Sequence, residues 1–341
     1  MEKIRVVVYG VGAIGSTIAR LLLEKEGIDI VGAIDVDKNK VGKDLGEVLQ
    51  TGKRLGVVVS DDYRKVLSKA CASIVIHATG SYLKDVYPQI APLAEYGVNV
   101  ISTCEELSYP YAAEPELAKK LEALGIKYAM TFLGTGINPG FLMDTLVIAL
   151  TGVCQKVSSI KVERVMNAGK RRVPFQKKVG AGLTVNEFKK KIETKAISGH
   201  VGLEQSIGMI ASALRWELDK IVVAPPEPVL AKEAVASDAV KVKKGDVAGL
   251  RQLAKGTMKR KDVITLGFQA YIGAQEEYDA ITIDGVPPVH QRISPCVHGD
   301  YATAAVIVNS IPKVMNAAPG LATMKDLPVI SATVEDMRKY V

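Results

Sequence analysis

Cysteine, histidine and aromatic residues are scarce in this chain. Its 341 residues include four cysteines and four histidines, and aromatic side chains make up 5%. The cysteines stand far apart, at positions 71, 104, 154 and 296, with no Cys-x-x-Cys pair and no histidine at metal-ligand spacing. This pattern excludes a disulfide framework and favours buried free thiols, so we expect no metal site.

Long apolar runs are absent as well. No stretch approaches the roughly 20 apolar residues that a membrane-spanning helix needs, and the charged start, followed at once by a strand pattern, is not that of a signal peptide. Hydrophobic residues make up 48% of the chain and charged residues 24%, which is typical of a folded, water-soluble protein. We therefore expect a cytoplasmic protein that does not associate with membranes.

The net charge is +7, but the basic clusters lack interleaved aromatic residues. These clusters are 170–172, 177–178, 189–191 and 259–261. Proteins that bind single-stranded nucleic acids combine such charges with aromatic stacking platforms, which this sequence does not offer. We expect solvated faces, or attraction of an anionic cofactor, and no nucleic-acid partner.

Short β-branched runs alternate with helical stretches over the first 135 residues. Strands are expected at 4–9, 28–35, 56–60, 73–79, 98–103 and 127–133. Helices are expected at 14–25, 61–71, 83–96 and 111–124, with Pro88 and Pro92 interrupting the third. This order is typical of the α/β class with a doubly wound parallel sheet, the Rossmann fold, in which ligands bind at the carboxyl ends of the strands.

The pattern changes after residue 135. A turn-rich segment, 134–141, precedes a helix at 143–150, longer alternating strands at 158–166, 263–272 and 278–283, and a helix at 203–214. These elements predict a second, α+β domain on an open mixed sheet, residues 136–299, that binds the substrate. The apolar helix expected at 301–315 should return to the first domain, so that residues 1–135 and about 300–341 form the dinucleotide-binding domain.

The first predicted strand and helix are joined by Gly-Val-Gly-Ala-Ile-Gly, residues 10–15. Gly10 permits a tight turn, Gly12 lets the backbone approach a pyrophosphate, and Gly15 lets the helix pack closely on the strand. The phosphates would lie at the helix N-terminus, beside Ala13 and Ile14. In this context the motif predicts a nicotinamide dinucleotide cofactor.

Asp35 ends the second predicted strand, where it can accept hydrogen bonds from the adenosine ribose. A carboxylate repels the 2′-phosphate of NADP and so favours NAD, whereas Lys38 and Lys40 could neutralise that phosphate. We expect use of both NAD and NADP, with NAD favoured. Thr79 and Gly80, after the fourth strand, are expected to bracket the nicotinamide ribose.

Two polar residues near the expected sheet edge have both plain and functional interpretations. His77 lies inside the fourth strand, where a histidine is more often a core residue than a catalytic base. Asn138 lies in Gly-Thr-Gly-Ile-Asn-Pro-Gly-Phe, residues 134–141, which is a hinge by composition. Its glycines also allow the backbone to pass close to the nicotinamide, so Asn138 is a candidate partner of the carboxamide.

Two adjacent acids, Glu105 and Glu106, follow the fifth predicted strand. At the carboxyl edge of a Rossmann sheet such an acid lies near the nicotinamide, where it can stabilise a developing iminium and shuttle a proton. The plain alternative is a helix start with acids near its positive end. Adjacent side chains cannot both point the same way. We therefore expect only one of the two to act in catalysis, and both are kept as candidates.

Candidate substrate-binding residues are dispersed over the rest of the chain. Asn167 and Arg171 lie at the end of a predicted strand and in the basic cluster behind it, and His200 precedes the helix at 203–214. Arg171, Arg172 or His200 could donate hydrogen bonds to a substrate carboxylate, although most such charges are surface residues. Thr303 lies in the first turn of the last apolar helix, after a Gly-Asp capping sequence.

Four of these segments together resemble the 2,4-diaminopentanoate dehydrogenase family, which includes the native amine dehydrogenases. They are the glycine motif, Ile-Ser-Thr-Cys-Glu-Glu-Leu-Ser-Tyr-Pro (101–110), the segment 134–141 and Gly-Asp-Tyr-Ala-Thr-Ala-Ala (299–305). The first domain is also similar to that of dihydrodipicolinate reductase. The resemblance implies a homodimer that oxidatively deaminates the 4-amino group of 2,4-diaminopentanoate with NAD(P), giving 2-amino-4-oxopentanoate and ammonia in ornithine degradation. It places the catalytic glutamate at Glu105 or Glu106.

Three other hypotheses about the function remain. An amine dehydrogenase acting on simple ketones and ammonia would have an apolar pocket without a carboxylate clamp. A reductase of the dihydrodipicolinate type would need closely spaced histidines and lysine, which this sequence lacks. A non-catalytic NAD(P)-sensing protein would not require the glutamate pair.

Overall fold

The computed structural model describes residues 2–341, which divide into two compact units. The first unit comprises the residues up to Phe141 together with His298–Val341, and the second comprises Leu142–Val297. Among residues 2–341, no helix is both long and apolar enough to cross a membrane. The two units differ in architecture and are described in turn.

Seven parallel strands form the sheet of the first unit. They are β1 (Ile4–Tyr9), β2 (Ile28–Ile34), β3 (Val59–Ser60), β4 (Ile74–His77), β5 (Asn99–Ser102), β6 (Thr131–Gly134) and β16 (Gly320–Ala322). Their order is β16-β6-β5-β4-β1-β2-β3, with every neighbouring pair parallel. The chain runs outward from β1 to β3 and then returns to β4 on the other side of β1. The predicted Rossmann sheet is confirmed, and its order reverses between β1 and β4, where such sheets bind ligands.

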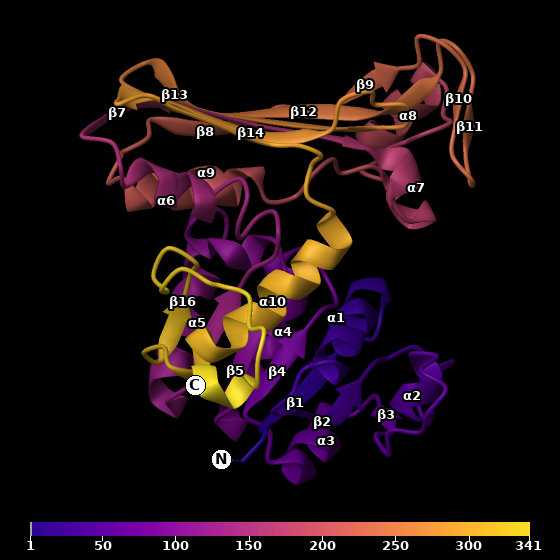
Figure 1. Ribbon diagram of the computed structural model, residues 1–341, viewed down its shortest axis with the longest axis vertical. Coiled ribbons are helices and arrows are strands. Elements are labelled where there is room, and N and C mark those ends of the chain that lie inside the picture. Colours follow the sequence, from indigo (N-terminus) through magenta and orange to yellow (C-terminus); the bar gives the residue numbers. More distant parts are fainter. Residues whose placement is uncertain (1) are drawn as a thin grey trace. The chain divides into compact units, whose positions relative to one another are not determined.

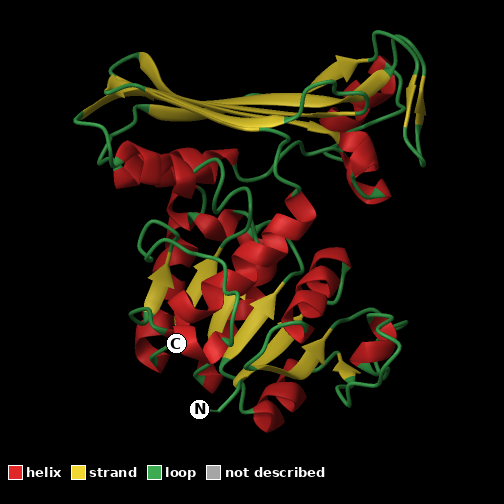
Figure 2. Cartoon of the chain, viewed as in Figure 1, coloured by secondary structure: helices red, strands yellow, loops and turns green. Residues whose placement is uncertain are grey.

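Helices cover both faces of this sheet (Figures 1 and 2). They are α1 (Ala13–Leu23), α3 (Tyr63–Ala70), α4 (Leu83–Ile90), α5 (Pro115–Tyr128) and α10 (Gly299–Met315), whereas the short α2 (Leu45–Val48) lies beside the edge strand β3. Residues of α3, α4 and α5 pack with the strands in one buried apolar cluster. The helices α1 and α10 pack against each other, and α10 also contacts β4, β5 and β6. The last apolar helix therefore does return to the first sheet.

The boundary between α5 and β6 differs from the prediction. The helix expected to end at residue 124 continues to Tyr128, and a left-handed Ala129 (φ 52°) follows it. The strand expected from residue 127 therefore begins only at Thr131. Lys127 and Tyr128 carry side chains that suit either element, so the local pattern cannot decide between them.

The proline-containing helix expected at 83–96 is divided into two. It forms α4 and then the 3₁₀-helix η1 (Ala91–Tyr96). Pro88 and Pro92 lack the N–H groups that one continuous α-helix would use. The short elements α2 and β16 were not predicted, because four-residue and three-residue segments show no periodicity.

The second unit is built on a mixed sheet. Its elements are α6 (Thr145–Thr151), β7 (Lys156–Asn167), α7 (Val173–Lys178), α8 (Val185–Glu193), α9 (Leu203–Ala213), β8 (Lys220–Val223), β9 (Glu227–Leu230), β10 (Val235–Ala236), β11 (Lys241–Val242), β12 (Val247–Met258), β13 (Lys261–Tyr271), β14 (Tyr278–Val286) and β15 (Val289–Ile293). The order is β15-β14-β7-β13-β12-β8, and β9 also pairs with β12. Only β7 and β13 run parallel among the described pairs, which agrees with the predicted open mixed sheet.

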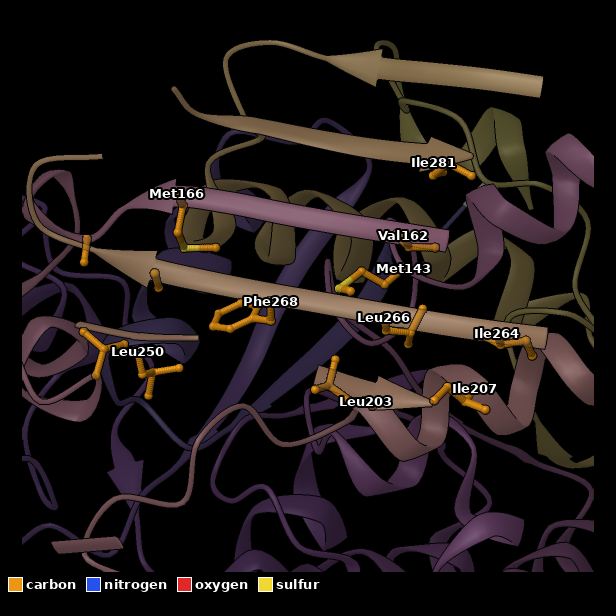
Figure 3. Close-up of a cluster of buried hydrophobic side chains, with 14 of the residues drawn as sticks. Met143, Val162, Met166, Leu203, Ile207, Leu250, Ile264, Leu266, Phe268 and Ile281 are labelled. Carbon is orange, nitrogen blue, oxygen red and sulfur yellow. The ribbon is translucent and has the colours of Figure 1, made fainter. Parts of the chain in front are cut away.

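The core of the second unit lies on one face of this sheet (Figure 3). Alternate residues point to that face, among them Val162 and Met166 of β7 and Leu266 and Phe268 of β13. The helices of the unit contribute to the same buried cluster, for example through Ile207 of α9. Within the described residues, no helix of this unit covers the opposite face (Figure 1).

The long strand β12 was missed in the sequence because two glycines weaken its pattern. Both glycines are required by packing. A Cβ atom at Gly249 would lie 2.5 Å from the Cα atom of Tyr271 on β13, and one at Gly256 would lie 2.8 Å from Ile207 of α9. The residues that lower the strand propensity are therefore the ones that let β12 approach its neighbours.

Candidate cofactor site and active site

The glycine motif forms the turn between β1 and α1. Gly10 has φ +92°, and a Cβ atom there would overlap the backbone carbonyl of Ala78 at the end of β4. A Cβ atom at Gly15 would overlap the carbonyl of Gly10. Among the described residues nothing lies within 4 Å of a Cβ atom placed on Gly12. The protein's own packing thus requires Gly10 and Gly15, whereas Gly12 borders open space.

The start of α1 has the features of an anion-binding site. Its N-cap residue, Gly12, provides no side-chain cap, and the first turn contains no acidic residue. The first N–H groups of a helix have no partner inside the helix and carry the positive end of its dipole. Ala13 and Ile14 supply N–H groups at this position, so the turn fits the pyrophosphate of a dinucleotide.

Asp35 lies just beyond β2, next to the glycine motif. One carboxylate oxygen, Oδ2, accepts the backbone N–H of Val11 at 2.8 Å, and Oδ1 accepts that of Asp37 at 2.9 Å. The ammonium of Lys40 lies 3.1 Å from Oδ2. Asp35 is therefore oriented by the cofactor turn itself, at the edge where the adenosine ribose was expected.

His77 is a core residue in the structure, in agreement with the plainer interpretation. It is fully buried, with Nδ1 2.9 Å from the Ser102 hydroxyl of β5. Its Nε2 lies 2.9 Å from the hydroxyl of Thr79 and 3.0 Å from Oε1 of Gln89 on α4. Burial lowers the pKa of His77 to about 4, despite the hydrogen bond with Gln89. This neutral ring joins β4 to β5 and α4, and it holds the Thr79 side chain at the sheet edge.

The two adjacent glutamates are held in different ways. Glu106 accepts the backbone N–H of Leu83, the first residue of α4, on its carboxylate at 2.7 Å. Its own N–H donates to the carbonyl of Ser81 at 3.2 Å. Glu105 precedes the 3₁₀-helix η2 (Glu106–Ser108), and its backbone carbonyl accepts the Ser108 hydroxyl at 2.7 Å. The carboxylate of Glu106 thus fastens the turn after β4, which includes Gly80, to the turn after β5.

The turn after β6 packs on the glutamate turn. A Cβ atom at Gly134 would overlap the backbone of Leu107 in η2, and Thr135 donates its N–H to the carbonyl of Ser102 at 2.9 Å. The turn contains a cis peptide bond before Pro139, next to Asn138. Thr303 of α10 lies against the same turn, 3.6 Å from a Cβ atom placed on Gly136.

The first unit therefore brings together the candidates that the sequence places in it. The glycine motif contacts the end of β4, the turn after β4 is fastened to Glu106, and η2 packs on the turn that carries Asn138. Because these turns follow adjacent parallel strands, they form one continuous edge that begins at Asp35 and ends at the turn carrying Asn138, against which Thr303 of α10 packs.

Asn167, in the second unit, braces a turn. Its side-chain oxygen accepts the N–H groups of Gly169 at 2.9 Å and Gly273 at 3.3 Å, and its own N–H donates to Glu277 at 3.0 Å. These bonds hold the end of β7 to the loop after β13. A contact of Asn167 with substrate stays a prediction.

Arg171 and His200 approach the same region of the second sheet. The Arg171 guanidinium lies 4.5 Å from the centre of the Phe175 ring and 3.5 Å from the sulfur of Met166. The His200 ring stacks on Phe268 with the ring centres 4.3 Å apart. Figure 3 shows Met166 and Phe268 on adjacent strands, pointing to the same face.

The imidazole of His200 is neutral at physiological pH. Burial lowers its pKa to about 3, and the nearby positive charges of Lys178 and Arg164 act in the same direction. A neutral imidazole carries one N–H donor. His200 can therefore donate a hydrogen bond to an anion without itself adding charge.

Arg164 is a candidate that the sequence analysis did not select. Its side chain is 2% exposed, and it donates to Asp279 and to the carbonyl of Val297, each at 2.6 Å. Asp279 in turn accepts the N–H of Val297 at 2.8 Å. The sequence did contain a sign that Arg164 is unusual. It occupies a core-facing position of β7, alternating in step with Val162 and Met166, where an apolar residue is expected.

Comparison with known proteins gives two matching family profiles. The profile of the 2,4-diaminopentanoate dehydrogenase C-terminal domain matches residues 141–341, and that of the dihydrodipicolinate reductase N-terminus matches residues 4–105. The 2,4-diaminopentanoate dehydrogenase of Acetoanaerobium sticklandii is 37% identical over 347 residues, with 100% of this chain and 98% of that protein covered.

Solved structures show the same relationships. An amine dehydrogenase from Mycobacterium smegmatis superposes with a TM-score of 0.85 at 31% identity, over 97% of this chain and 98% of that one. A dihydrodipicolinate reductase from Paenisporosarcina sp. TG-14 gives a TM-score of 0.54 at 12% identity, over 95% and 98% of the two chains. The second likeness concerns the fold alone.

The glycines of the motif should separate into two functional classes when each is replaced by alanine. Gly15→Ala should lower the melting temperature of the cofactor-free protein, because overpacking of this kind costs about 1–3 kcal/mol. Gly12→Ala should leave that temperature unchanged and weaken NAD(P) binding at least about tenfold, since its methyl group enters the space left for the phosphates. Thermal melting and isothermal titration measure the two effects. Equal cofactor affinity in Gly12→Ala and the wild type would contradict this placement of the phosphates.

Proposed function

Because the chain belongs to the 2,4-diaminopentanoate dehydrogenase family, we propose that it oxidatively deaminates 2,4-diaminopentanoate with NAD(P), forming 2-amino-4-oxopentanoate and ammonia. The protein is a nicotinamide-dependent oxidoreductase that acts on amines. The observation that carries the choice of reaction is the pair of acids after β5, in a turn that contacts the turns after β4 and β6. A negative charge at this edge stabilises a developing iminium, which oxidation of an alcohol does not form.

Within this proposal the two glutamates have separate tasks. Glu106 is a positioning residue, because its carboxylate and its N–H are bonded to Leu83 and Ser81 of the neighbouring turn. Glu105 acts on the substrate, since adjacent residues direct their side chains differently and that of Glu106 is turned toward α4. This division is supported by the bonds of Glu106.

The bound cofactor supplies the hydride acceptor. The Glu105 carboxylate removes a proton from the 4-ammonium group of the substrate, so that the neutral amine can be oxidised at its carbon. Once this proton has passed from Glu105 to solvent, the carboxylate is negative again and stabilises the iminium that develops. The same residue assists the addition of water to the iminium and returns a proton to the departing nitrogen, which leaves as ammonia.

The substrate carboxylate needs cationic or N–H partners, and the second unit offers a cluster of them. Arg164 uses two of its nitrogens on Asp279 and Val297, and a guanidinium has five N–H groups in all. The positive charge of Arg171 acts to lower the pKa of Arg164, and that of Arg164 acts to lower the pKa of His200, so the three side chains are close to one another. We assign the carboxylate to Arg164, Arg171 and His200. A contact of Thr303 with substrate stays a prediction.

A second candidate function is amine dehydrogenation of simple substrates without a carboxylate. It is favoured by the likeness to a solved amine dehydrogenase. The basic cluster described above favours the diamino acid instead, because its N–H groups can donate charge-assisted hydrogen bonds to a carboxylate, which a simple amine lacks.

Substrate choice tests the proposed function directly. In the oxidative direction, kcat/KM for 2,4-diaminopentanoate should exceed that for 2-aminopentane at least tenfold, because a charge-assisted hydrogen bond contributes about 1.5–3 kcal/mol. Arg171→Met and His200→Leu should raise KM for the diamino acid about tenfold and leave the values for 2-aminopentane within about threefold. The absorbance of the reduced nicotinamide, at about 340 nm, measures these values.

The other outcomes separate the alternatives. A wild-type enzyme that prefers 2-aminopentane would support amine dehydrogenation of simple substrates. A protein that binds NAD(P) tightly but reduces it with neither compound, nor with alanine or ornithine, would be a non-catalytic sensor.

The roles of the glutamates can be distinguished with isosteric variants. Glu105→Gln should lower kcat by about 10²–10⁴, the usual contribution of general acid–base catalysis, without weakening cofactor binding. Glu106→Gln keeps a carbonyl oxygen for the Leu83 N–H and should retain turnover within about tenfold. Glu106→Ala loses that bond and should be less stable by about 1 kcal/mol. The assignment is wrong if Glu106→Gln is the inactive variant, and acid assistance itself is wrong if both retain turnover.

We propose that both NAD and NADP serve as cofactors, with NAD favoured. The support for NAD is the Asp35 carboxylate beyond β2, which suits a ribose diol and repels a 2′-phosphate. The support for NADP is the ammonium of Lys40 on the same carboxylate.

The protein is also proposed to form a homodimer through the second unit. The sheet face opposite its core carries small and aromatic residues, including Gly267 of β13, Ala280 of β14, and Tyr271 and Tyr278 beside them. Two such sheets can pack face to face at about 10 Å. This face therefore suits a second copy of the chain.

A long charged side chain at position 267, in the middle of this face, should produce a monomer, because its bulk keeps two sheets from packing face to face. A Cβ atom on Gly267 would meet nothing closer than Glu163 Cγ at 3.8 Å, so Gly267→Arg leaves the subunit's own packing intact. Light scattering should give twice the chain mass of 36.5 kDa for the wild type and the single mass for this variant. Val153→Arg, at an exposed site outside the sheet, is the matched control. A wild-type protein of single chain mass would contradict the dimer.

A further inference from the structure

A lysine lies directly on the carboxylate that was expected to select the cofactor. The Lys40 ammonium is 3.1 Å from Oδ2 of Asp35 and 3.4 Å from Oδ2 of Asp37. The side chain of Lys40 is 25% exposed and that of Asp35 10% exposed. Although burial acts to lower it, the hydrogen bonds and charges of these two acids raise the pKa of Lys40, which is therefore a cation at neutral pH.

The turn after β2 holds Lys40 in this place. The carboxylate of Asp37 accepts the backbone N–H of Asn39 at 2.9 Å and its side-chain amide at 3.0 Å. The carbonyl of Asp37 accepts the N–H groups of Lys40 at 2.8 Å and Val41 at 3.0 Å. These bonds fix the backbone of Lys40 within the turn, so that its side chain extends to the carboxylate of Asp35.

The ammonium changes what Asp35 can do. Alone, a carboxylate at the end of β2 binds the ribose diol of NAD and repels the 2′-phosphate of NADP. A cation 3.1 Å away offsets most of that repulsion. Asp35 also keeps the N–H groups of Val11 and Asp37 when Lys40 moves, so its orientation does not depend on the lysine.

We propose that Lys40 is the residue that determines how well NADP is accepted, by exchanging its ion pair with Asp35 for one with the 2′-phosphate. With NAD the ammonium stays on Asp35, and the carboxylate serves the ribose. The ammonium has an anionic partner in both states, Asp35 without NADP and the 2′-phosphate with it, so the exchange leaves no unpaired cation. The inference rests on the proposed use of both cofactors, and it names the residue responsible.

The test measures equilibrium binding to the cofactor-free protein, so it does not depend on turnover. Dissociation constants for NAD⁺ and NADP⁺ are determined by isothermal titration for the wild type, Lys40→Met and Lys43→Met. Lys43→Met is the matched control, because Lys43 is half exposed and pairs with Glu47 at 3.4 Å. Thermal melting of each variant records whether it is folded.

Lys40→Met should weaken NADP⁺ binding at least tenfold and NAD⁺ binding less than threefold, and Lys43→Met should change neither by more than threefold. Asp37→Asn, which removes one partner of the ammonium, should strengthen NADP⁺ binding two- to fivefold. An unchanged ratio of the two constants in Lys40→Met, or an equal loss for both cofactors, overturns the proposal. A protein that binds both cofactors as stated but oxidises no amine would overturn the proposed function and leave this inference standing.

Discussion

The close contact between the turn after β1 and the end of β4 is the constraint on which the functional edge depends. Gly10 lies against the Ala78 carbonyl, and Gly15 lies against Gly10, at distances that exclude any Cβ atom. This contact sets the direction of α1 and turns the N–H of Val11 toward Asp35. The start of the helix, Asp35 and the end of β4 are therefore positioned by one piece of backbone packing, before any cofactor contributes.

The same kind of contact continues along the sheet edge. Glu106 fastens the turn after β4 to η2, and Gly134 lets η2 rest on the backbone after β6. Each of these contacts is made by two backbone segments, or by a carboxylate bonded to a backbone N–H, and not by two side chains. Backbone contacts of this kind leave little freedom, and a catalytic group benefits from such rigidity because small displacements cost rate. The acids at this edge thus serve both the architecture and, in our proposal, the chemistry.

Prediction from sequence succeeded where the determining forces are local. β1 spans the predicted residues without change, and the glycine motif lies where its spacing requires. It failed where distant packing decides, as at β6, which begins only after α5 ends at a left-handed Ala129. Strand β12 was missed because the glycines that weaken its pattern are needed to approach β13 and α9. Arg164 was passed over because its partners, Asp279 and Val297, are more than a hundred residues away.

The sequence by itself determined the Rossmann sheet, the cofactor turn and the presence of acids after β5, because periodicity and glycine spacing act over a few residues. Only the tertiary structure decided which partner each polar group has. In the folded protein, His77 bonds to Ser102 in the core, the Glu106 carboxylate accepts the first N–H of α4, and Lys40 pairs with Asp35. Hydrogen bonds act over about 3 Å in space without regard to separation along the chain, so a chain pattern can list the groups but cannot pair them.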